Sequence, residues 1–167
     1  DMAMAAADHG KIVLCEKPLC IKPEDVKTLA EKLNIFTVLQ LRHHPLTQQL
    51  KKEISEHTRY QVEIDISVHR DLKYYASWKG QRERSGGVLF NLGIHYFDLL
   101  VYLFGEVDKA STSSLDEKTG TGTIEGPNFA CRWRISTDAA KESQKRIFKI
   151  NGIPYNFSSR DNLAYEN

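Results

Sequence analysis

The sequence lacks the features that mark secreted, zinc-binding and membrane-spanning proteins. Its three cysteines, Cys15, Cys20 and Cys131, are odd in number and fit neither a disulfide framework nor the paired spacing of zinc ligands. No apolar run approaches the ~20 residues needed to cross a bilayer, and no basic segment leads into a signal-peptide core at the N-terminus. We therefore expect a soluble protein of the reducing cytoplasm, with no membrane partner.

An excess of charge of one sign is also lacking. The chain has 23 lysines and arginines against 22 aspartates and glutamates, which gives a formal net charge of +1. The lysines are scattered and form no basic stripe of the kind that neutralises nucleic-acid phosphates, which argues against a nucleic-acid partner. With 41% hydrophobic and 27% charged residues among 167, the composition is typical of a globular protein with one substantial core.

The first forty residues carry the pattern of a strand, a helix and a second strand. Residues 11–15 form a short apolar run typical of a buried parallel strand, and residues 35–39 form another. Between them, apolar residues recur at helical spacing after Pro23, which suits the first turn of a helix. This βαβ order predicts that residues 1–41 are the C-terminal remnant of a doubly wound dinucleotide-binding domain.

The rest of the chain, residues 42–167, has the pattern of a second domain of the α+β class. Alternation of apolar and polar residues over 60–69 predicts a strand with one covered face, which antiparallel sheets tolerate. Residues 70–87 have the composition of a loop. We expect a mostly antiparallel open sheet with helices on one face, in which the last strands form a meander. The remaining helices are predicted over 45–56 and 94–103, and the remaining strands over about 106–115, 119–125, 128–136 and 146–150.

One candidate reactive group follows the first predicted strand. The segment Glu16-Lys17-Pro18 places a lysine at the carboxyl end of a parallel strand, where open α/β sheets bind their ligands. An exposed lysine beside a proline is the ordinary alternative, because most lysines are solvated.

A second candidate is the glycine-containing segment SGGVLFNLGIHYFD. It contains Asn91, His95 and Asp98 at positions i, i+4 and i+7, so one face of a helix would present all three side chains. Gly86 and Gly87 would let the backbone approach a ligand closely. A hydrogen-bonded core histidine is an equally good interpretation of His95.

Taken together, these motifs resemble the Gfo/Idh/MocA oxidoreductases. The resemblance rests on EKP after the first strand, QLRHHP after the second, and Gly-Gly followed by Gly-x-His-x-x-Asp, and it covers nearly the whole chain. The segments SWKG, SGG and NLGIH are further similar to the bacterial dehydrogenases that oxidise the 3-hydroxyl of UDP-N-acetylglucosaminuronic acid. Those enzymes work in O-antigen and related polysaccharide biosynthesis.

The resemblance implies an NAD(P)-dependent oxidoreductase that transfers hydride from a sugar hydroxyl to nicotinamide. A neutral imidazole, with an ordinary pKa of ~6.5, suits a general base near neutral pH, and His95 would take that role. Lys17 would stabilise the negative charge that develops on the same oxygen. Asn91 completes the catalytic set by orienting the sugar or the lysine. Many family members carry Asp where this chain has Asn91, so no proton transfer is implied there.

The resemblance also implies which residues contact the cofactor. Glu16, Lys17 and Pro18 would lie near the nicotinamide ribose, and Trp78 and Lys79 would lie against the nicotinamide half. Packing of Trp78 beneath its own loop is an equally good interpretation. We expect NAD as the cofactor, and NADP stays open because the acidic residue that reads the ribose lies in the part of such domains upstream of this segment.

Arg42, Asn91 and His95 are the residues implied to bind substrate. The forked donors of Arg42 suit a carboxylate or a diphosphate, and an ordinary surface ion pair is an equally good interpretation. His43 and His44 are adjacent in the sequence and lack the i, i+4 geometry of a helical metal pair, so we expect no metal site.

The glycine-rich Gly-x-Gly-x-x-Gly loop that holds a dinucleotide's pyrophosphate has no counterpart in the sequence. We therefore expect this chain alone to be inactive as a dehydrogenase. Two alternatives stay open: another sugar or inositol dehydrogenase of the same family, or a catalytically inactive module for dimerisation or binding. The resemblance implies a small-molecule sugar or sugar-nucleotide ligand, and a homodimer or homotetramer formed through the open sheet.

Overall fold

Two separate β-sheets organise residues 2–157, which are the part of the chain that this computed structural model describes. The smaller sheet has two parallel strands, β1 (Val13–Cys15) and β2 (Ile35–Thr37). Helix α2 (Pro23–Ala30) joins them, and helix α1 (Met2–Asp8) precedes them. The predicted βαβ arrangement is therefore confirmed, with strands shorter than expected.

The larger sheet has six strands in the order β4-β5-β6-β3-β7-β8. All neighbouring strands are antiparallel except β3 and β6, which run parallel. The predicted α+β class with a mostly antiparallel open sheet is confirmed. The strands are β3 (Tyr60–Ser67), β4 (Lys109–Leu115), β5 (Thr119–Gly126), β6 (Phe129–Ser136), β7 (Lys145–Ile150) and β8 (Ile153–Tyr155).

The predicted meander of the last strands is confirmed for β4, β5 and β6, and it is wrong for β7, which pairs with β3 and not with β6. Strands β4, β5 and β6 are successive antiparallel neighbours, but β3 lies between β6 and β7. The apolar residues of β3, among them Ile64 and Ile66, are fully buried. Such a strand is favoured at the centre of a sheet, where its backbone groups pair along both edges. After β6 the chain returns through a short turn, η4 (Lys141–Ser143), to pair with the other edge of β3.

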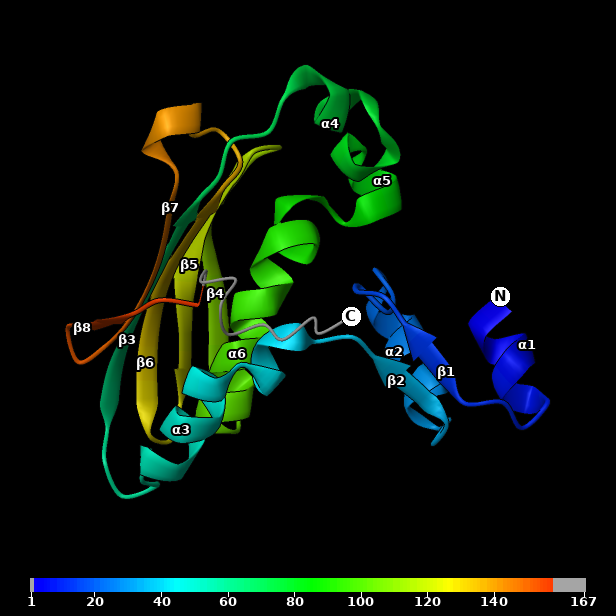
Figure 1. The fold of residues 1–167 in the computed structure, drawn as a ribbon, viewed down its shortest axis with the longest axis horizontal. Coiled ribbons are helices and arrows are strands. Elements are labelled where there is room, and N and C mark those ends of the chain that lie inside the picture. The colour runs from blue at the N-terminus through cyan, green and yellow to red at the C-terminus, as the bar shows by residue number, and fades with distance from the viewer. Residues whose placement is uncertain (1, 158–167) are drawn as a thin grey trace.

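Helices α3 (Pro45–Glu53) and α6 (Ile94–Phe104) cover one face of the large sheet, and the small sheet lies on that same side (Figure 1). Leu99 on α6 is fully buried, and Phe97 meets Trp133 of β6 edge-on, with ring centroids 5.2 Å apart. Burying a large apolar side chain contributes roughly 1.5–3 kcal/mol. This packing holds α6 firmly against the sheet.

The helical stretch Arg82–Phe104, which contains α6, is long and apolar enough to cross a membrane by length and composition. In this fold its residues Leu99, Leu100 and Leu103 belong to the buried core that α6 shares with the large sheet. Burial of this kind is typical of the central helix of a globular domain.

The prediction of a loop over 70–87 was wrong, because this segment forms short helices. They are α4 (Leu72–Ala76), η2 (Trp78–Gly80) and α5 (Arg82–Ser85). The Asp71 carboxylate accepts the Tyr74 backbone N–H at the start of α4, and the Ser77 hydroxyl accepts the Lys79 N–H at the start of η2. Side-chain caps of this kind stabilise single turns that are too short to show an apolar period.

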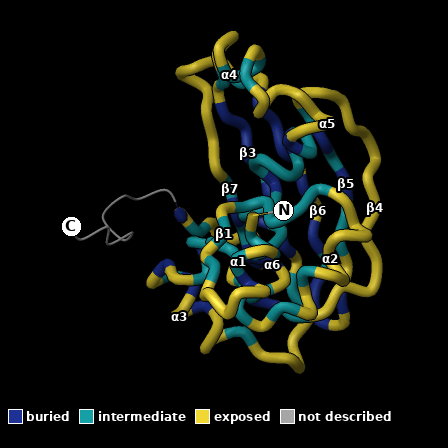
Figure 2. The backbone as a smooth tube through the Cα atoms, turned by 90° about the vertical axis from the view of Figure 1, so that its right-hand side faces the viewer, coloured by how far each residue is buried: buried dark blue, intermediate teal, exposed yellow. Residues whose placement is uncertain are grey.

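Burial is uneven between the two sheets. Figure 2 shows the buried stretches gathered along the strands and helix of the large sheet, whereas β4 at its edge is exposed throughout. On the small sheet and its connections, Ile12 and Leu14 are 81% and 73% exposed. A domain boundary at residues 41 and 42 stays a prediction, and residues 158–167 of the predicted second domain lie outside the described residues.

Candidate active site

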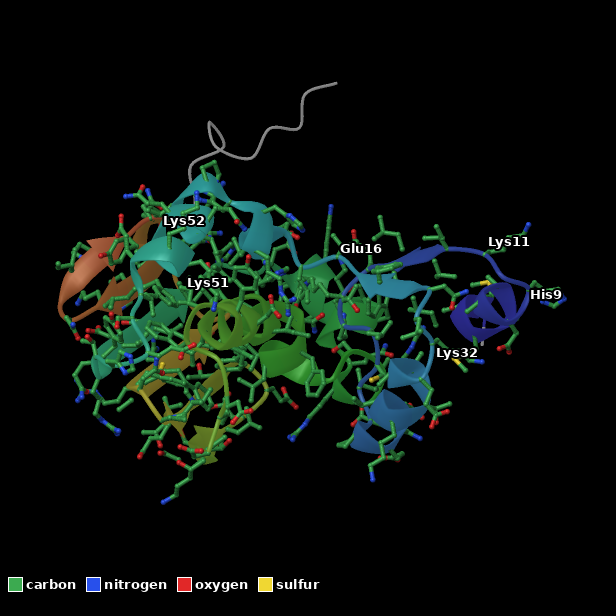
Figure 3. The ribbon with its side chains drawn as sticks, turned by 90° about the horizontal axis from the view of Figure 1, so that it is seen from below. His9, Lys11, Glu16, Lys32, Lys51 and Lys52 are labelled. Carbon is green, nitrogen blue, oxygen red and sulfur yellow. The ribbon has the colours of Figure 1, made fainter. Side chains whose placement is uncertain are left out.

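Lys17 reaches from the small sheet to the long helix that covers the large sheet. It follows β1, and its Nζ donates a hydrogen bond of 2.6 Å to the backbone carbonyl of Asn91, 74 positions along the chain. Figure 3 shows its neighbour Glu16 at the end of the small sheet nearest the large one, with His9 and Lys11 at the far end. The carboxyl end of β1 is therefore where the two parts of the chain meet.

The segment that receives Lys17 is a π-helix, η3 (Leu89–Gly93), which runs directly into α6. Single π turns inside helices occur frequently at functional sites. The preceding Gly86 has φ +75°, and a Cβ placed on it would lie 2.5 Å from Cγ of Phe90. Glycine is therefore required at this entry to the helix.

The Asn91 side chain is held by backbone groups. Its Nδ2 donates to the carbonyl of Lys79 at 3.0 Å and to the carbonyl of Gly87 at 3.1 Å. The amide thus ties η2 to the π-helix, while the Asn91 carbonyl faces Lys17. The predicted role of Asn91 in orienting the lysine has a geometric counterpart in this backbone contact.

His95 lies in the first turn of α6, partly buried. Its Nδ1 is buried and has no hydrogen-bond partner among the described residues. Burial first, and then the positive charge of Lys17, lower the pKa of His95 to about 4, although the carboxylates of Asp98 and Glu16 act in the opposite direction. His95 is therefore a neutral imidazole at physiological pH, and its buried Nδ1 is left without a protein partner among the described residues.

Lys17 shares this environment. Burial lowers the pKa of Lys17, as do the nearby charges of Lys79 and Arg70, whereas Glu16 raises it. Among residues 2–157, no carboxylate forms an ion pair with the Lys17 amine. The charged amine of Lys17 thus acts on the imidazole of His95 in one partly buried place. The amine can donate to a ligand oxygen, and the neutral imidazole can accept a proton.

Arg42 is engaged by Asp98. Its Nε donates to Asp98 Oδ2 at 2.9 Å, its Nη2 donates to Oδ1, and its guanidinium lies 5.4 Å from the ring centroid of Tyr102. Of the two interpretations left open by the sequence, the structure contains the ion pair. That pair fixes the carboxylate of Asp98, which lies one helical turn beyond His95. A contact between Arg42 and substrate stays a prediction.

Trp78 is 45% exposed, so it does not pack beneath its own loop. The Lys79 amine lies 5.8 Å from the centroid of its ring. Since the Lys79 carbonyl accepts the Asn91 amide, both residues are tethered to the site. An exposed aromatic ring next to a partly buried reactive pair suits the nicotinamide half of a dinucleotide.

Sequence reasoning missed a cavity at the end of β3. Its lining includes Arg70 and Lys141, which come from separate connections of the large sheet. The only sequence signal was the position of Arg70 directly after the predicted strand. Lys141 gave none, because its place depends on how the chain returns from β6 to β7.

The residues present fit the nicotinamide half of NAD, and the sequence has no glycine-rich loop for the diphosphate. The unpartnered Nδ1 of His95 and the exposed ring of Trp78 are the observations that carry this fit. Among the residues that the structure describes, no group of three or more His, Cys, Asp or Glu side chains could hold a metal ion.

Comparisons with known proteins point to one family. Residues 51–128 match the model of the Gfo/Idh/MocA oxidoreductase family, C-terminal alpha/beta domain. The WlbA (WbpB) dehydrogenase of Thermus thermophilus, solved with NAD and UDP-GlcNAcA, superposes with a TM-score of 0.86 and 29% identity, covering 97% of this chain and 58% of that one. The WlbA dehydrogenase of Bordetella pertussis, solved with NADH and UDP-GlcNAcA, gives 0.77 and 26%, covering 92% and 53%. Inositol 2-dehydrogenase of Rhodococcus jostii is 29% identical over 161 residues, 91% of this chain and 42% of that protein.

The fold and these matches define an oxidoreductase domain of the α+β class. The chain belongs to the Gfo/Idh/MocA oxidoreductase family. It spans about half the length of the relatives it matches, from 42% of the inositol dehydrogenase to 58% of the Thermus thermophilus enzyme.

Proposed function

We propose that this chain is the catalytic, substrate-binding portion of a cytoplasmic NAD(P)-dependent sugar dehydrogenase. The observation that carries the proposal is the meeting of Lys17 and His95 at one partly buried place, where the Nδ1 of His95 has no partner among the described residues. The proposed substrate is a UDP-N-acetyl-hexosaminuronic acid oxidised at C3. Two relatives solved with UDP-GlcNAcA support this choice. A place in O-antigen or related polysaccharide biosynthesis is part of the same proposal.

In the proposed reaction His95 removes the hydroxyl proton. Its low pKa means that the imidazole is neutral and ready to accept at physiological pH. The Lys17 amine donates a hydrogen bond to the same oxygen and stabilises the negative charge that develops there. Bound NAD would supply the hydride acceptor for the substrate carbon. Glu16, Pro18 and Trp78 are the proposed neighbours of its nicotinamide half.

The hydrogen bond from Lys17 to the Asn91 carbonyl positions the amine before substrate arrives. Because Asn91 is itself tied to η2 and to Gly87, this acceptor cannot drift far from His95 on the same helix. Preorganised donors of this kind are worth most where water is largely excluded, as in this partly buried site.

An absorbance assay tests the proposal. The protein would be prepared with an upstream glycine-rich nucleotide-binding segment, then mixed with NAD and UDP-GlcNAcA, and NADH formation followed at its own absorbance band. We expect turnover with this substrate and little with myo-inositol. Turnover with inositol alone would favour the second candidate, an inositol dehydrogenase, which the matched inositol enzyme supports. Calorimetry that detected neither NAD nor UDP-sugar binding would favour an inactive module.

We further propose that the chain forms a homodimer or homotetramer through the open face of the large sheet. Hydroxyl side chains pair across strands on that sheet, for example Ser111 with Thr123 and Ser114 with Thr121. Analytical ultracentrifugation tests this, and a monomer at micromolar concentration would contradict it.

A further inference from the structure

A cavity of 630 Å³ opens at the end of β3, next to the candidate active site. Four segments of the chain build it: the residues that follow β3, helix α4, the η2 turn and the η4 turn. We call it the cationic cavity, and its lining consists of His69, Arg70, Asp71, Tyr74, Lys79 and Lys141.

Positive charge dominates this lining. Arg70, Lys79 and Lys141 face the cavity with one carboxylate, Asp71, which is already engaged as the cap of α4. In the part of the chain that the structure describes, none of the three cations has an ion-pair partner. Unneutralised cations gathered around one cavity repel one another, and an anion bound there relieves that repulsion.

The guanidinium of Arg70 is held in place by two contacts. Arg70 lies over the ring of Tyr74, 5.3 Å from its centroid, and its Nη1 donates to the His69 carbonyl at 3.3 Å. These contacts hold the guanidinium beside the cavity. A guanidinium fork matches the two oxygens of a carboxylate.

The cationic cavity adjoins the reactive pair. Both Arg70 and Lys79 repel the charge of Lys17 closely enough to affect its ionisation. Lys79 also accepts the amide of Asn91 through its carbonyl, so η2 borders the cavity and the site together. A ligand anchored by its anion in the cavity can therefore present a nearby group to Lys17 and His95.

We infer that the cationic cavity binds the carboxylate of an acidic sugar, on the same ring as the hydroxyl that meets Lys17 and His95. Arg70 and Lys141 are the specificity-determining residues. This inference rests on the proposed function, which it deepens by making the negative charge of the sugar itself a requirement. A carboxylate is favoured over a diphosphate because the cavity lies beside the reacting position, within reach of one sugar ring.

An NMR titration of the 167-residue chain tests this. Uniformly ¹⁵N-labelled protein is titrated with UDP-GlcNAcA, with UDP-GlcNAc, which carries the same nucleotide on an uncharged sugar, and with NAD. The three ligands separate a sugar carboxylate from substrate phosphates and from cofactor phosphates. The variants are Arg70→Met and Lys141→Met, and Lys73→Met, an exposed lysine on α4 outside the cavity, is the matched control.

We expect UDP-GlcNAcA to shift the amides of residues 69–74 and 141, and to bind about ten-fold more tightly than UDP-GlcNAc, as one lost charge-assisted hydrogen bond predicts. Each cavity variant should weaken UDP-GlcNAcA by ~10-fold and leave UDP-GlcNAc unchanged, and Lys73→Met should change neither. All these residues are partly or fully exposed, so the ¹⁵N spectra should confirm an unchanged fold.

Three results would overturn the inference. They are equal affinity for the charged and uncharged sugars, shifts confined to other parts of the chain, and no binding of UDP-GlcNAcA at all. NAD shifts in the cavity with the same sensitivity to Arg70 would also contradict it, by assigning the cavity to cofactor phosphates. Carboxylate-dependent binding without NADH formation in the absorbance assay would instead overturn the proposed function and leave the cavity assignment intact.

Discussion

At the scale of single residues, the site depends on two basic groups, and the charge of Lys17 helps to lower the pKa of His95. Lys17 and His95 were both identified from sequence, because each stands in a motif at a strand end or a helix start. The effect of Lys17 on the pKa of His95 was not predictable, since it depends on burial and on a contact of Lys17 with Asn91, 74 positions along the chain. Arg70 and Lys141 were missed because isolated basic residues carry no pattern.

Removal of the Lys17 amine should reduce kcat by ~100-fold or more in the whole enzyme, because a positioned donor to the developing oxyanion is lost. Steady-state NADH formation by Lys17→Ala measures this. Lys11→Ala is the matched control, since Lys11 is an exposed lysine at the far end of the small sheet and should keep full activity (Figure 3). A Lys17→Ala enzyme within a few-fold of the unaltered one would contradict the proposed mechanism.

At the scale of elements, the π-helix makes the arrangement of the site differ from the one expected from sequence. The spacing of Asn91, His95 and Asp98 predicted a single helix face. The π turn over Leu89–Gly93 instead directs the Asn91 amide to backbone carbonyls, and Arg42 holds Asp98. A π turn contains one more residue than an α turn. The spacing of residues in the sequence does not show which of the two turns the backbone forms.

The glycine at the entrance to this helix should be intolerant of substitution. Gly86→Ala adds a Cβ 2.5 Å from Phe90 at a φ of +75°, and it should lower the free energy of unfolding by about 1–3 kcal/mol. Urea denaturation measures the change. Gly152→Ala is the control, because it has a similar φ of +81° and open space around the added atom. Equal losses in the two variants would show that contact with Phe90 is unimportant.

The Arg42–Asp98 pair should affect both stability and ionisation. Asp98 is only 11% exposed, so Arg42→Leu leaves its carboxylate poorly solvated and should cost about 1–3 kcal/mol. The unpaired carboxylate should also raise the pKa of His95. Urea denaturation and an NMR pH titration measure the two effects. Arg59→Leu, at an exposed arginine before β3, should produce neither, and an Arg42→Leu protein indistinguishable from it would refute this role.

At the scale of the whole molecule, alternation and helical periodicity were enough to predict the α+β class and the βαβ unit. They could not place β3 between β6 and β7, because strand order depends on which pairings bury Ile64 and Ile66 best. The contact of Lys17 with the π-helix η3 likewise depends on tertiary packing.

His95 should make the protein less stable as the pH falls. Its pKa is about 4 in the folded chain and near 6.5 when unfolded, so the unfolded state binds more protons between these values. The free energy of unfolding should therefore be fully maintained above pH 6.5 and decline toward pH 4, with a slope of at most about 1.4 kcal/mol per pH unit. Urea denaturation of His95→Gln between pH 7 and 5 should show a shallower slope. An unchanged slope would mean that His95 is solvated.

The central claim is that the Lys17 amine and the His95 imidazole meet at one place. An NMR titration of the His95 ring, in the chain itself and in Lys17→Met, tests it most directly. We predict a His95 that stays neutral to below pH 5, and a pKa that rises when the lysine is removed, with Lys11→Met leaving it unchanged. A His95 that titrates near pH 6.5 whether or not Lys17 is present would contradict the account.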